Sequence, residues 1–181
     1  YIQDHKNLLK LKTDIRNLNH YKDHLQNIDV VIHLACISND PSFELNPKLG
    51  KSINFDCFEP FVDECYKNNV KKFIYASSSS VYGLKKEKDV IETMSLEPLT
   101  DYSFYKAECE KVLNNFSSKE FCTVSLRPAT VCGYSPRQRL DLVVNILTNF
   151  AYHKKMIKIM GGEQLRPNIN INDMVNSYIS I

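Results

Sequence analysis

The sequence predicts an α/β protein built on a parallel sheet. Three short apolar runs, at 30–35, 70–76 and 120–127, have the length and composition of buried strands. Two longer stretches, at 47–69 and 140–153, carry apolar residues at helical spacing. Strands that alternate with helices along a chain form parallel sheets covered by helices, because each crossover returns over a face of the sheet.

The remaining segments complete the predicted order of elements. Residues 8–13 and 156–160 are predicted to form short strands, and residues 17–26 to form a surface helix. The connections 37–47 and 84–100 are polar and irregular, which predicts loops. Long loops in a compact domain are often functional.

Composition places the chain among ordinary globular proteins. It has 181 residues, a hydrophobic fraction of 43% and a net charge of +2 with no basic stripe, so we expect no nucleic-acid partner. Its apolar runs are too short to span a bilayer and no signal peptide is visible, which predicts a cytoplasmic protein with no membrane partner. The six cysteines form no CxxC pair and no zinc-ligand spacing, so they are predicted to be buried reduced thiols, with no metal site.

A tyrosine and a lysine four residues apart predict an acid/base pair. Tyr102 and Lys106 follow two residues that can cap a helix, Thr100 and Asp101, and would then lie on one helical face. A free tyrosine has a pKa of about 10, but a neighbouring ammonium favours the phenolate and lowers that pKa. Such a pair can exchange a proton with a substrate hydroxyl.

The same spacing occurs at Tyr82 and Lys86. Gly83 and a charge cluster follow Tyr82, so we predict that this second pair does not lie on a helix. A solvent-facing helix that happens to carry both residue types is the alternative for Tyr102 as well. The choice between an acid/base pair and a solvent-facing helix therefore depends on the neighbouring segments.

Three further segments give Tyr102 its context. The sequences VVIHLA at 30–35, KFIYASSSSVYG at 72–83 and LRPATVCG at 126–133 each end a predicted strand. Together with Tyr102-x-x-x-Lys106 they resemble the extended short-chain dehydrogenase/reductase family, the NAD-dependent epimerases and dehydratases of nucleotide sugars. The resemblance covers nearly the whole chain. It implies a Rossmann-like doubly wound sheet, NAD as cofactor with NADP as an alternative, and a nucleotide-diphosphate sugar as substrate.

The resemblance implies catalytic roles for three residues. Tyr102 would take a proton from the sugar 4-hydroxyl while hydride passes to the nicotinamide. Lys106 would lower the tyrosine pKa and bind the nicotinamide ribose. Ser78, counted back from the Val-Tyr-Gly that follows the serine run, would hydrogen-bond the reacting oxygen. Ser79 and Ser80 stand where the related dehydratases carry an Asp and a Glu.

Contacts to cofactor and substrate are implied in the same way. The residues expected to touch the cofactor are Asp14, Ile15, Ala35, Cys36, Asn54, Ala76, Tyr102 and Lys106. Those expected to touch the substrate are Ser78, Ser79, Ser80, Thr130 and Arg166. Asn54 would help to anchor the lysine through water, with a local hydrogen bond as the alternative. Arg166 would meet the diphosphate, with surface solvation as the alternative.

The resemblance also predicts the domain organisation. Residues 1–132 would form part of an NAD-binding Rossmann domain, and residues 133–181 part of a smaller substrate-binding region. The Gly-rich turn that binds the pyrophosphate in this family is absent from the sequence, which has five glycines. We therefore expect a fragment without the N-terminal unit and the C-terminal end. The family often forms homodimers, for which the helices at 47–69 and 102–116 would supply the contact.

The predicted activity is that of a nucleotide-sugar 4-epimerase, which oxidises C4 of the sugar transiently. The alternatives are a 4,6-dehydratase or a 4-reductase of the same family, or a non-catalytic member that binds a dinucleotide or a partner protein. A dehydratase needs a further base and acid, and the hydroxyls of Ser79 and Ser80 are poor at both tasks. Asp40 or Glu92 could still reach the site from a loop.

Overall fold

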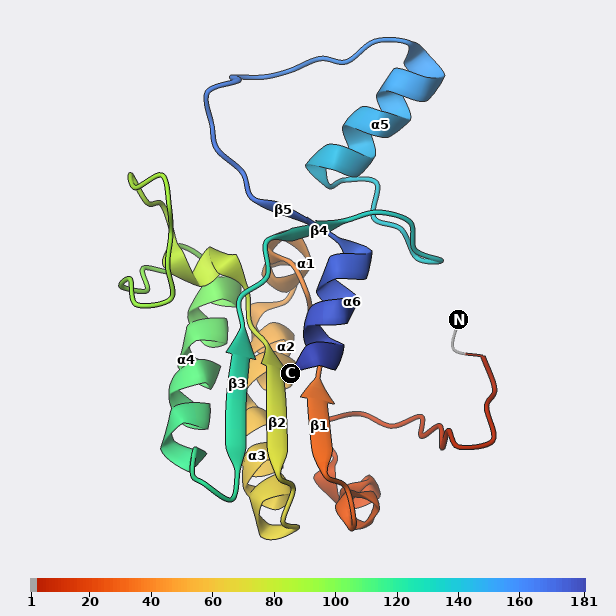
Figure 1. The fold of residues 1–181 in the computed structure, drawn as a ribbon, viewed down its shortest axis with the longest axis vertical. Coiled ribbons are helices and arrows are strands. Elements are labelled where there is room, and N and C mark those ends of the chain that lie inside the picture. Colours follow the sequence, from red (N-terminus) through yellow and green to blue (C-terminus); the bar gives the residue numbers. More distant parts are fainter. Residues whose placement is uncertain (1–2) are drawn as a thin grey trace. The chain divides into compact units, whose positions relative to one another are not determined.

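The computed structural model describes residues 3–181, whose elements are shown in Figure 1, and its contacts divide the chain into two compact units. One unit spans Asn7–Arg127. The other comprises Pro128–Ile181 together with residues 3–6. The assignment of residues 1–132 to cofactor binding and of residues 133–181 to substrate binding stays a prediction.

A parallel three-stranded sheet forms the centre of the Asn7–Arg127 unit. Its strands are β1 (Val30–His33), β2 (Lys72–Ala76) and β3 (Cys122–Leu126), in the order β1-β2-β3. The helical elements around it are η1 (Leu18–His20), η2 (Lys22–Leu25), α1 (Asp40–Glu44), α2 (Pro47–Lys51), η3 (Ser52–Asp56), α3 (Phe58–Lys67), η4 (Ser79–Tyr82) and α4 (Asp101–Phe116). The predicted Rossmann-like parallel sheet is confirmed.

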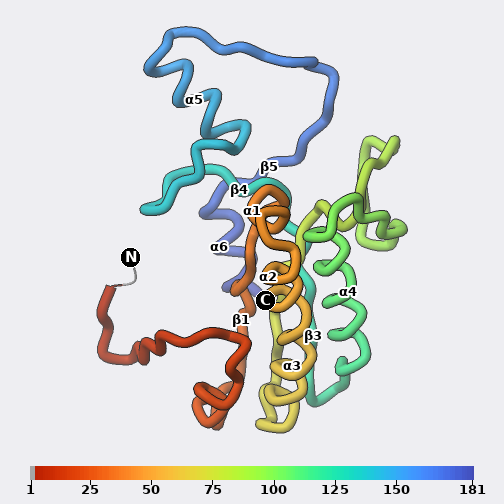
Figure 2. Tube along the Cα trace, turned by 180° about the vertical axis from the view of Figure 1, so that it is seen from behind, coloured from red at the N-terminus to blue at the C-terminus, as the bar shows by residue number. Residues whose placement is uncertain are grey.

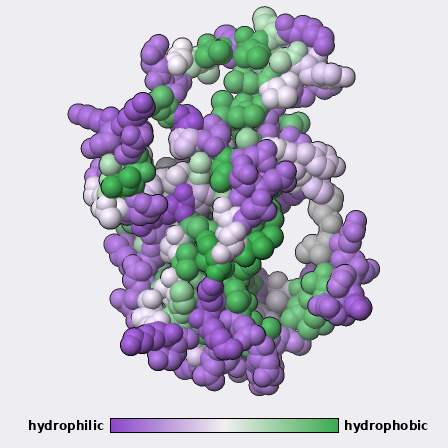
Figure 3. All heavy atoms as spheres, viewed as in Figure 1, coloured by the Kyte–Doolittle hydropathy of each residue, from purple (hydrophilic) through white to green (hydrophobic). Residues whose placement is uncertain are grey.

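The two long helices of this unit lie on one face of the sheet. The strands follow one another in a single direction, so two right-handed crossovers place α3 and α4 on the same side. Figure 2 shows these helices next to each other in front of the strands. On the opposite face, β1 and the residue after it present Val30, Ile32 and Leu34, which are 47%, 45% and 58% exposed. Figure 3 shows that hydrophobic residues are exposed on the side of the molecule seen in Figure 1.

The core between sheet and helices is rich in aromatic rings. Phe58 and Phe61 of α3 pack against Phe73 of β2, with ring centroids 6.0 and 5.8 Å apart. Tyr75, also of β2, lies 4.8 Å from Phe58. His33 of β1 is buried among these rings, 5.3 Å from Phe58. The core thus holds an imidazole in apolar surroundings.

Burial makes His33 a source of acid sensitivity. Desolvation, with a smaller contribution from the charge of Lys106, lowers the pKa of His33 to about 3, against about 6.5 in an unfolded chain. The unfolded chain therefore binds a proton below about pH 6.5 that the folded chain does not bind until about pH 3, and stability falls as pH falls through this window. We expect His33→Leu to remove this loss, which amounts to about 2 kcal/mol between pH 7 and pH 5.

Urea unfolding at pH 7 and pH 5 measures this difference. His24→Leu, at an exposed position of η2, is the matched control and should keep the wild-type pH dependence. A His33→Leu variant that loses as much stability on acidification as the wild type would contradict the expectation.

Four predicted segments of this unit differ in the structure, and the first is the loop predicted at 37–47, which contains the short helix α1. Residues 8–13 are not a strand, because no described strand lies beside them to pair their backbone groups, and Leu9 is 68% exposed. Residues 17–26 form two short 3₁₀ helices instead of one helix. Only Leu25 is buried there, and a helix gains most of its stability from packing. The predicted helix 47–69 is interrupted by η3, which is a π-helical turn.

The Pro128–Ile181 unit contains a second, two-stranded parallel sheet. Strand β4 (Thr130–Cys132) pairs with β5 (Asn168–Asn170). The helices of this unit are α5 (Val143–Lys154) and α6 (Ile171–Ser180). The segment 156–160, predicted as a strand, has none of the pairing a strand requires. None of the helices formed by residues 3–181 has the length and apolar composition needed to cross a membrane.

Candidate active site

Helix α4 begins with a capping box that fixes the position of Tyr102. The Thr100 hydroxyl accepts a hydrogen bond from the backbone N–H of Ser103 at 3.2 Å, and the Ser103 hydroxyl accepts one from the backbone N–H of Thr100 at 3.1 Å. Reciprocal bonds of this kind satisfy N–H groups that the first turn of a helix leaves open. Tyr102 therefore lies in the first turn of α4, and Lys106 lies one turn further along.

Lys106 is buried between α4 and the sheet. Its side chain is 3% exposed, and its Nζ donates a hydrogen bond of 2.6 Å to the backbone carbonyl of Ala76, at the end of β2. The same Nζ lies 5.8 Å from the ring centroid of Tyr102 and 4.8 Å from that of Tyr75. The lysine ammonium thus sits beside the ring of the predicted catalytic phenol.

The serine run turns at the carboxyl edge of the sheet. Ser78 caps η4, and its Oγ accepts hydrogen bonds from the backbone N–H of Ser80 at 3.2 Å and from the Ser80 hydroxyl at 2.8 Å. An oxygen that accepts two bonds keeps its own proton for donation. Ser78 therefore has its own proton available for donation, and Ser80 is its immediate partner; a hydrogen bond from Ser78 to a substrate oxygen stays a prediction.

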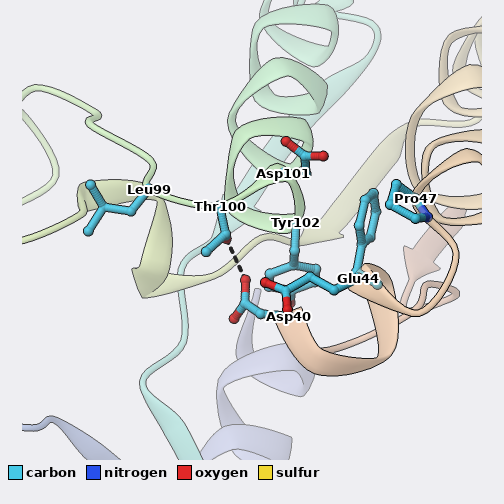
Figure 4. Close-up of a pocket in the computed structure, with 8 residues that line it drawn as sticks. Asp40, Glu44, Pro47, Leu99, Thr100, Asp101 and Tyr102 are labelled. Carbon is cyan, nitrogen blue, oxygen red and sulfur yellow. Dashed lines mark hydrogen bonds between the residues drawn. The ribbon is translucent and has the colours of Figure 1, made fainter.

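A pocket of about 250 Å³ opens beside Tyr102 (Figure 4). Its lining comes from α1 and its flank, and from the residues that start α4: Asp40, Phe43, Glu44, Pro47, Leu99, Thr100, Asp101 and Tyr102. The Thr100 hydroxyl donates a hydrogen bond to the Asp40 carboxylate. Asp40, which we named as a residue that could reach the site, therefore lies in the same pocket as Tyr102.

The pair Tyr82 and Lys86 does not share a helix. Tyr82 ends η4, and Gly83 follows with a φ of +69°, which turns the chain away. The Tyr82 hydroxyl accepts a hydrogen bond of 2.8 Å from Arg127, while Lys86 is exposed. The structure thus confirms that only Tyr102 has its lysine on the next helical turn.

A buried ion pair lies on the same face of α4. Glu110 is 4% exposed and accepts hydrogen bonds from Arg127 Nε at 3.0 Å and from an Arg127 terminal nitrogen at 2.6 Å. Its carboxylate also accepts a hydrogen bond from the Ser77 hydroxyl. We did not predict this network from the sequence. The sequence feature that could have indicated it is the position of Glu110, one helical turn after Lys106, on a helix face that also carries the apolar residues Ala107 and Leu113.

Asn54 makes hydrogen bonds to a distant residue, Ile37, rather than the local ones that we gave as its alternative role. It lies in the π-helical turn η3 and is 5% exposed. Its side chain accepts from the N–H of Ile37 at 2.8 Å and donates to the carbonyl of Ile37 at 3.0 Å. It therefore holds the start of the loop that leads to Asp40; a water-mediated link to Lys106 stays a prediction.

The other residues predicted to touch the cofactor are spread along the amino-terminal half of the unit. Arg16 binds the exposed carboxylate of Asp14 at 2.5 Å and lowers its pKa to about 2, and the carbonyl of Ile15 accepts from the Tyr21 hydroxyl at 2.7 Å. Ala35 and Cys36 follow β1, and Ala76 ends β2, so all three lie at the carboxyl edge of the sheet. This is the edge at which open α/β sheets bind ligands.

The fit to a dinucleotide is therefore partial. Small residues at the strand ends and the charge of Lys106 suit the nicotinamide half of such a cofactor. The five glycines, at 50, 83, 133, 161 and 162, form no Gly-rich turn that could cradle a pyrophosphate, and Gly133, which follows β4, is a single glycine there. The contacts of the other residues with the nicotinamide half stay predictions.

Thr130 and Arg166 belong to the Pro128–Ile181 unit. The backbone N–H of Thr130, at the start of β4, donates to the carbonyl of Pro167 at 3.3 Å. Arg166 is exposed, and its carbonyl accepts from the Asn168 side chain at 2.9 Å. Their contacts with a substrate stay predictions.

Comparison with known proteins places these observations in a family. A protein of Bacillus subtilis described as an uncharacterized UDP-glucose epimerase is 33% identical over 162 residues, which is 87% of this chain and 50% of that protein. The human dTDP-D-glucose 4,6-dehydratase is 26% identical over 159 residues, which is 86% of this chain and 45% of that protein. The chain thus spans about half the length of the curated relatives it matches.

Solved structures show the same fold. A UDP-N-acetylglucosamine 4-epimerase from Methanobrevibacter ruminantium superposes with a TM-score of 0.86 at 29% identity, over 97% of this chain and 58% of that one. The UDP-glucuronic acid 4-epimerase from Bacillus cereus, in complex with UDP-glucuronic acid and NAD, superposes with a TM-score of 0.77 at 31% identity, over 93% of this chain and 53% of that one. Residues 3–181 match the model of a protein family described as the NAD dependent epimerase/dehydratase family. The chain belongs to the NAD dependent epimerase/dehydratase family.

Proposed function

We propose that this chain carries the acid/base residues of an NAD-dependent nucleotide-sugar 4-epimerase, with Tyr102, Lys106 and Ser78 as its catalytic residues. The observation that carries the proposal is the pairing of Tyr102 and Lys106 on α4, with Lys106 hydrogen-bonded to the strand end that leads into Ser78. The 4-epimerases among the similar solved structures support this proposal at the level of the family, whose members also include dehydratases.

In the proposed reaction NAD, when bound, supplies the hydride acceptor at C4 that no side chain can provide. Tyr102 takes the proton from the 4-hydroxyl as C4 is oxidised, and returns it when the alcohol is re-formed. Lys106 stabilises the phenolate through its charge. Ser78 donates a hydrogen bond to the same oxygen, which its two accepted bonds leave it free to do. Ala35, Cys36 and Ala76 would line the cofactor.

The proposal also covers the contacts with the substrate and the oligomeric state. Thr130 and Arg166 would contribute from the Pro128–Ile181 unit, with Arg166 at the diphosphate, since a planar guanidinium matches phosphate oxygens. The complete protein would act as a homodimer, with α3 and α4 in the contact; the latter presents Phe104, which is 46% exposed.

The runner-up is a 4,6-dehydratase, an activity that relatives of this chain have. Elimination across C5 and C6 needs a base for the C5 proton and an acid for the departing oxygen. Ser79 and Ser80 follow Ser78 directly, and Ser80 is engaged with the Ser78 hydroxyl. The pocket beside Tyr102 is lined by three carboxylates, Asp40, Glu44 and Asp101, of which Asp40 is held by the Thr100 hydroxyl. A 4-epimerase needs neither extra group, so the serines favour epimerisation.

Incubation of the full-length protein with nucleotide hexoses in deuterated water separates these activities. We expect inversion at C4 with no deuterium at C5, because only O4 exchanges its proton with Tyr102. A 4-keto-6-deoxy product with deuterium at C5 would identify a dehydratase, and net reduction of added NAD or NADP with formation of a 4-keto sugar would identify a 4-reductase working in reverse. The absence of turnover with every nucleotide sugar would favour a non-catalytic member of the family.

A further inference from the structure

Two consecutive turns of α4 hold two consecutive residues at the end of β2. Lys106 donates to the carbonyl of Ala76, and Glu110, one turn later, accepts from the hydroxyl of Ser77. Residues four apart on a helix face the same side, so both side chains reach the strand end together. The helix that carries Tyr102 is thereby attached directly to the peptide that precedes Ser78.

Ser77 is fixed from the sheet side as well. Its backbone N–H donates a hydrogen bond of 2.8 Å to the carbonyl of Leu126, at the end of β3, and the residue is 4% exposed. Ser78 follows immediately and caps η4. The direction in which the chain leaves β2, and with it the place of the Ser78 hydroxyl, depends on how Ser77 is held.

Arg127 neutralises the carboxylate that holds Ser77. Both side chains of this ion pair are largely buried, at 19% exposed for Arg127 and 5% for Glu110, and Glu110 raises the pKa of the guanidinium above its usual range. The remaining nitrogen of Arg127 donates to the Tyr82 hydroxyl at 2.8 Å and to the carbonyl of Glu92 at 3.1 Å. The pair therefore also holds the end of η4 and the loop that follows.

A buried ion pair is weak support for stability, because removing two charges from water costs about as much as their attraction returns. What the arrangement provides is geometry: a planar guanidinium and a carboxylate accept few alternative orientations. Glu110 is saturated by Ser77 and Arg127, so neither partner can shift without losing a charged hydrogen bond.

We propose that Glu110, held by Arg127, is a positioning residue that fixes Ser77 and so sets the Ser78 hydroxyl relative to Tyr102. The inference rests on the proposed function in that Ser78 and Tyr102 act on the same oxygen. Displacements of about 1 Å in such a constellation cost up to a hundredfold in rate.

Ser77→Ala and Glu110→Gln test the proposal in the full-length protein. Ser77→Ala removes one hydroxyl and leaves the ion pair intact, so it should fold even if Glu110→Gln does not. We expect kcat to fall about tenfold in Ser77→Ala and between about 10- and 100-fold in Glu110→Gln, with KM within about twofold of the wild type. Glu108→Gln, which breaks the exposed pair with Lys111 on the same helix, is the matched control and should leave kcat unchanged.

Hydrogen exchange of residues 78–82 provides a readout that does not need turnover. We expect faster exchange there in Ser77→Ala and Glu110→Gln, and wild-type exchange in Glu108→Gln. Unchanged exchange at 78–82, or an unchanged kcat in an active protein, would overturn the positioning role and leave Glu110 a structural residue. If the wild type turns over no nucleotide sugar, the proposed function fails, and the exchange result alone decides whether Glu110 positions Ser78.

Discussion

Replacing Tyr102 with Phe is expected to lower kcat of the full-length protein by a factor of about a hundred or more. The phenol oxygen is the proposed proton acceptor, and no hydroxyl replaces it in phenylalanine. Lys106 keeps its hydrogen bond to the Ala76 carbonyl, so the strand end should stay in place. Steady-state kinetics of the purified variant, with the interconversion of the two C4 epimers as readout, measures the effect.

Tyr82→Phe is the matched control for this experiment. Tyr82 also has a lysine four residues later, but its hydroxyl accepts a hydrogen bond from Arg127 and it ends a short 3₁₀ helix. Its removal should cost about 1 kcal/mol of stability and much less activity than the loss of Tyr102. Equal losses of kcat in the two variants, or a larger loss for Tyr82→Phe, would overturn the assignment of the acid/base residue.

Gly83→Ala is expected to cost about 3 kcal/mol or more in stability. Gly83 has a φ of +69°, a conformation that L side chains rarely adopt, and an added Cβ would lie 2.1 Å from the carbonyl oxygen of Glu97. That oxygen cannot move away easily, because the N–H of Glu97 donates to the carbonyl of Val81 at 3.0 Å. Chemical denaturation followed by circular dichroism measures the change.

Gly162→Ala separates the two causes of this loss. Gly162 also has a positive φ, +132°, but an added Cβ there would meet no atom within 4 Å. It should therefore show only the backbone strain, about 1 to 2 kcal/mol. If Gly83→Ala is no less stable than Gly162→Ala, the backbone around the Val81–Glu97 hydrogen bond can move to accommodate the added methyl group.

The elements with strong local signals were predicted from the residues alone. Strands β1, β2 and β3 are runs rich in apolar, β-branched and aromatic residues, which favour extended structure, although Val30 and Ile32 of β1 stay exposed. Helix α4 follows Thr100, whose side chain caps the first turn as predicted. Gly83 separates the Tyr82 pair from a helix, and the capped start of α4 places Tyr102 and Lys106 one turn apart. In these cases neighbours in the sequence carry the information.

Other features depend on residues that are distant along the chain. Residues 8–13 have a strand-like composition, but a strand forms only where another strand can pair with it. Glu110 reads as a surface charge on a helix, and its burial becomes tolerable only because Arg127 and Ser77 meet it there. Asn54 and Ile37 are joined in the same way. Hydrogen bonds and ion pairs of this kind carry no local pattern, since their partners come together only when the sheet and its helices have packed.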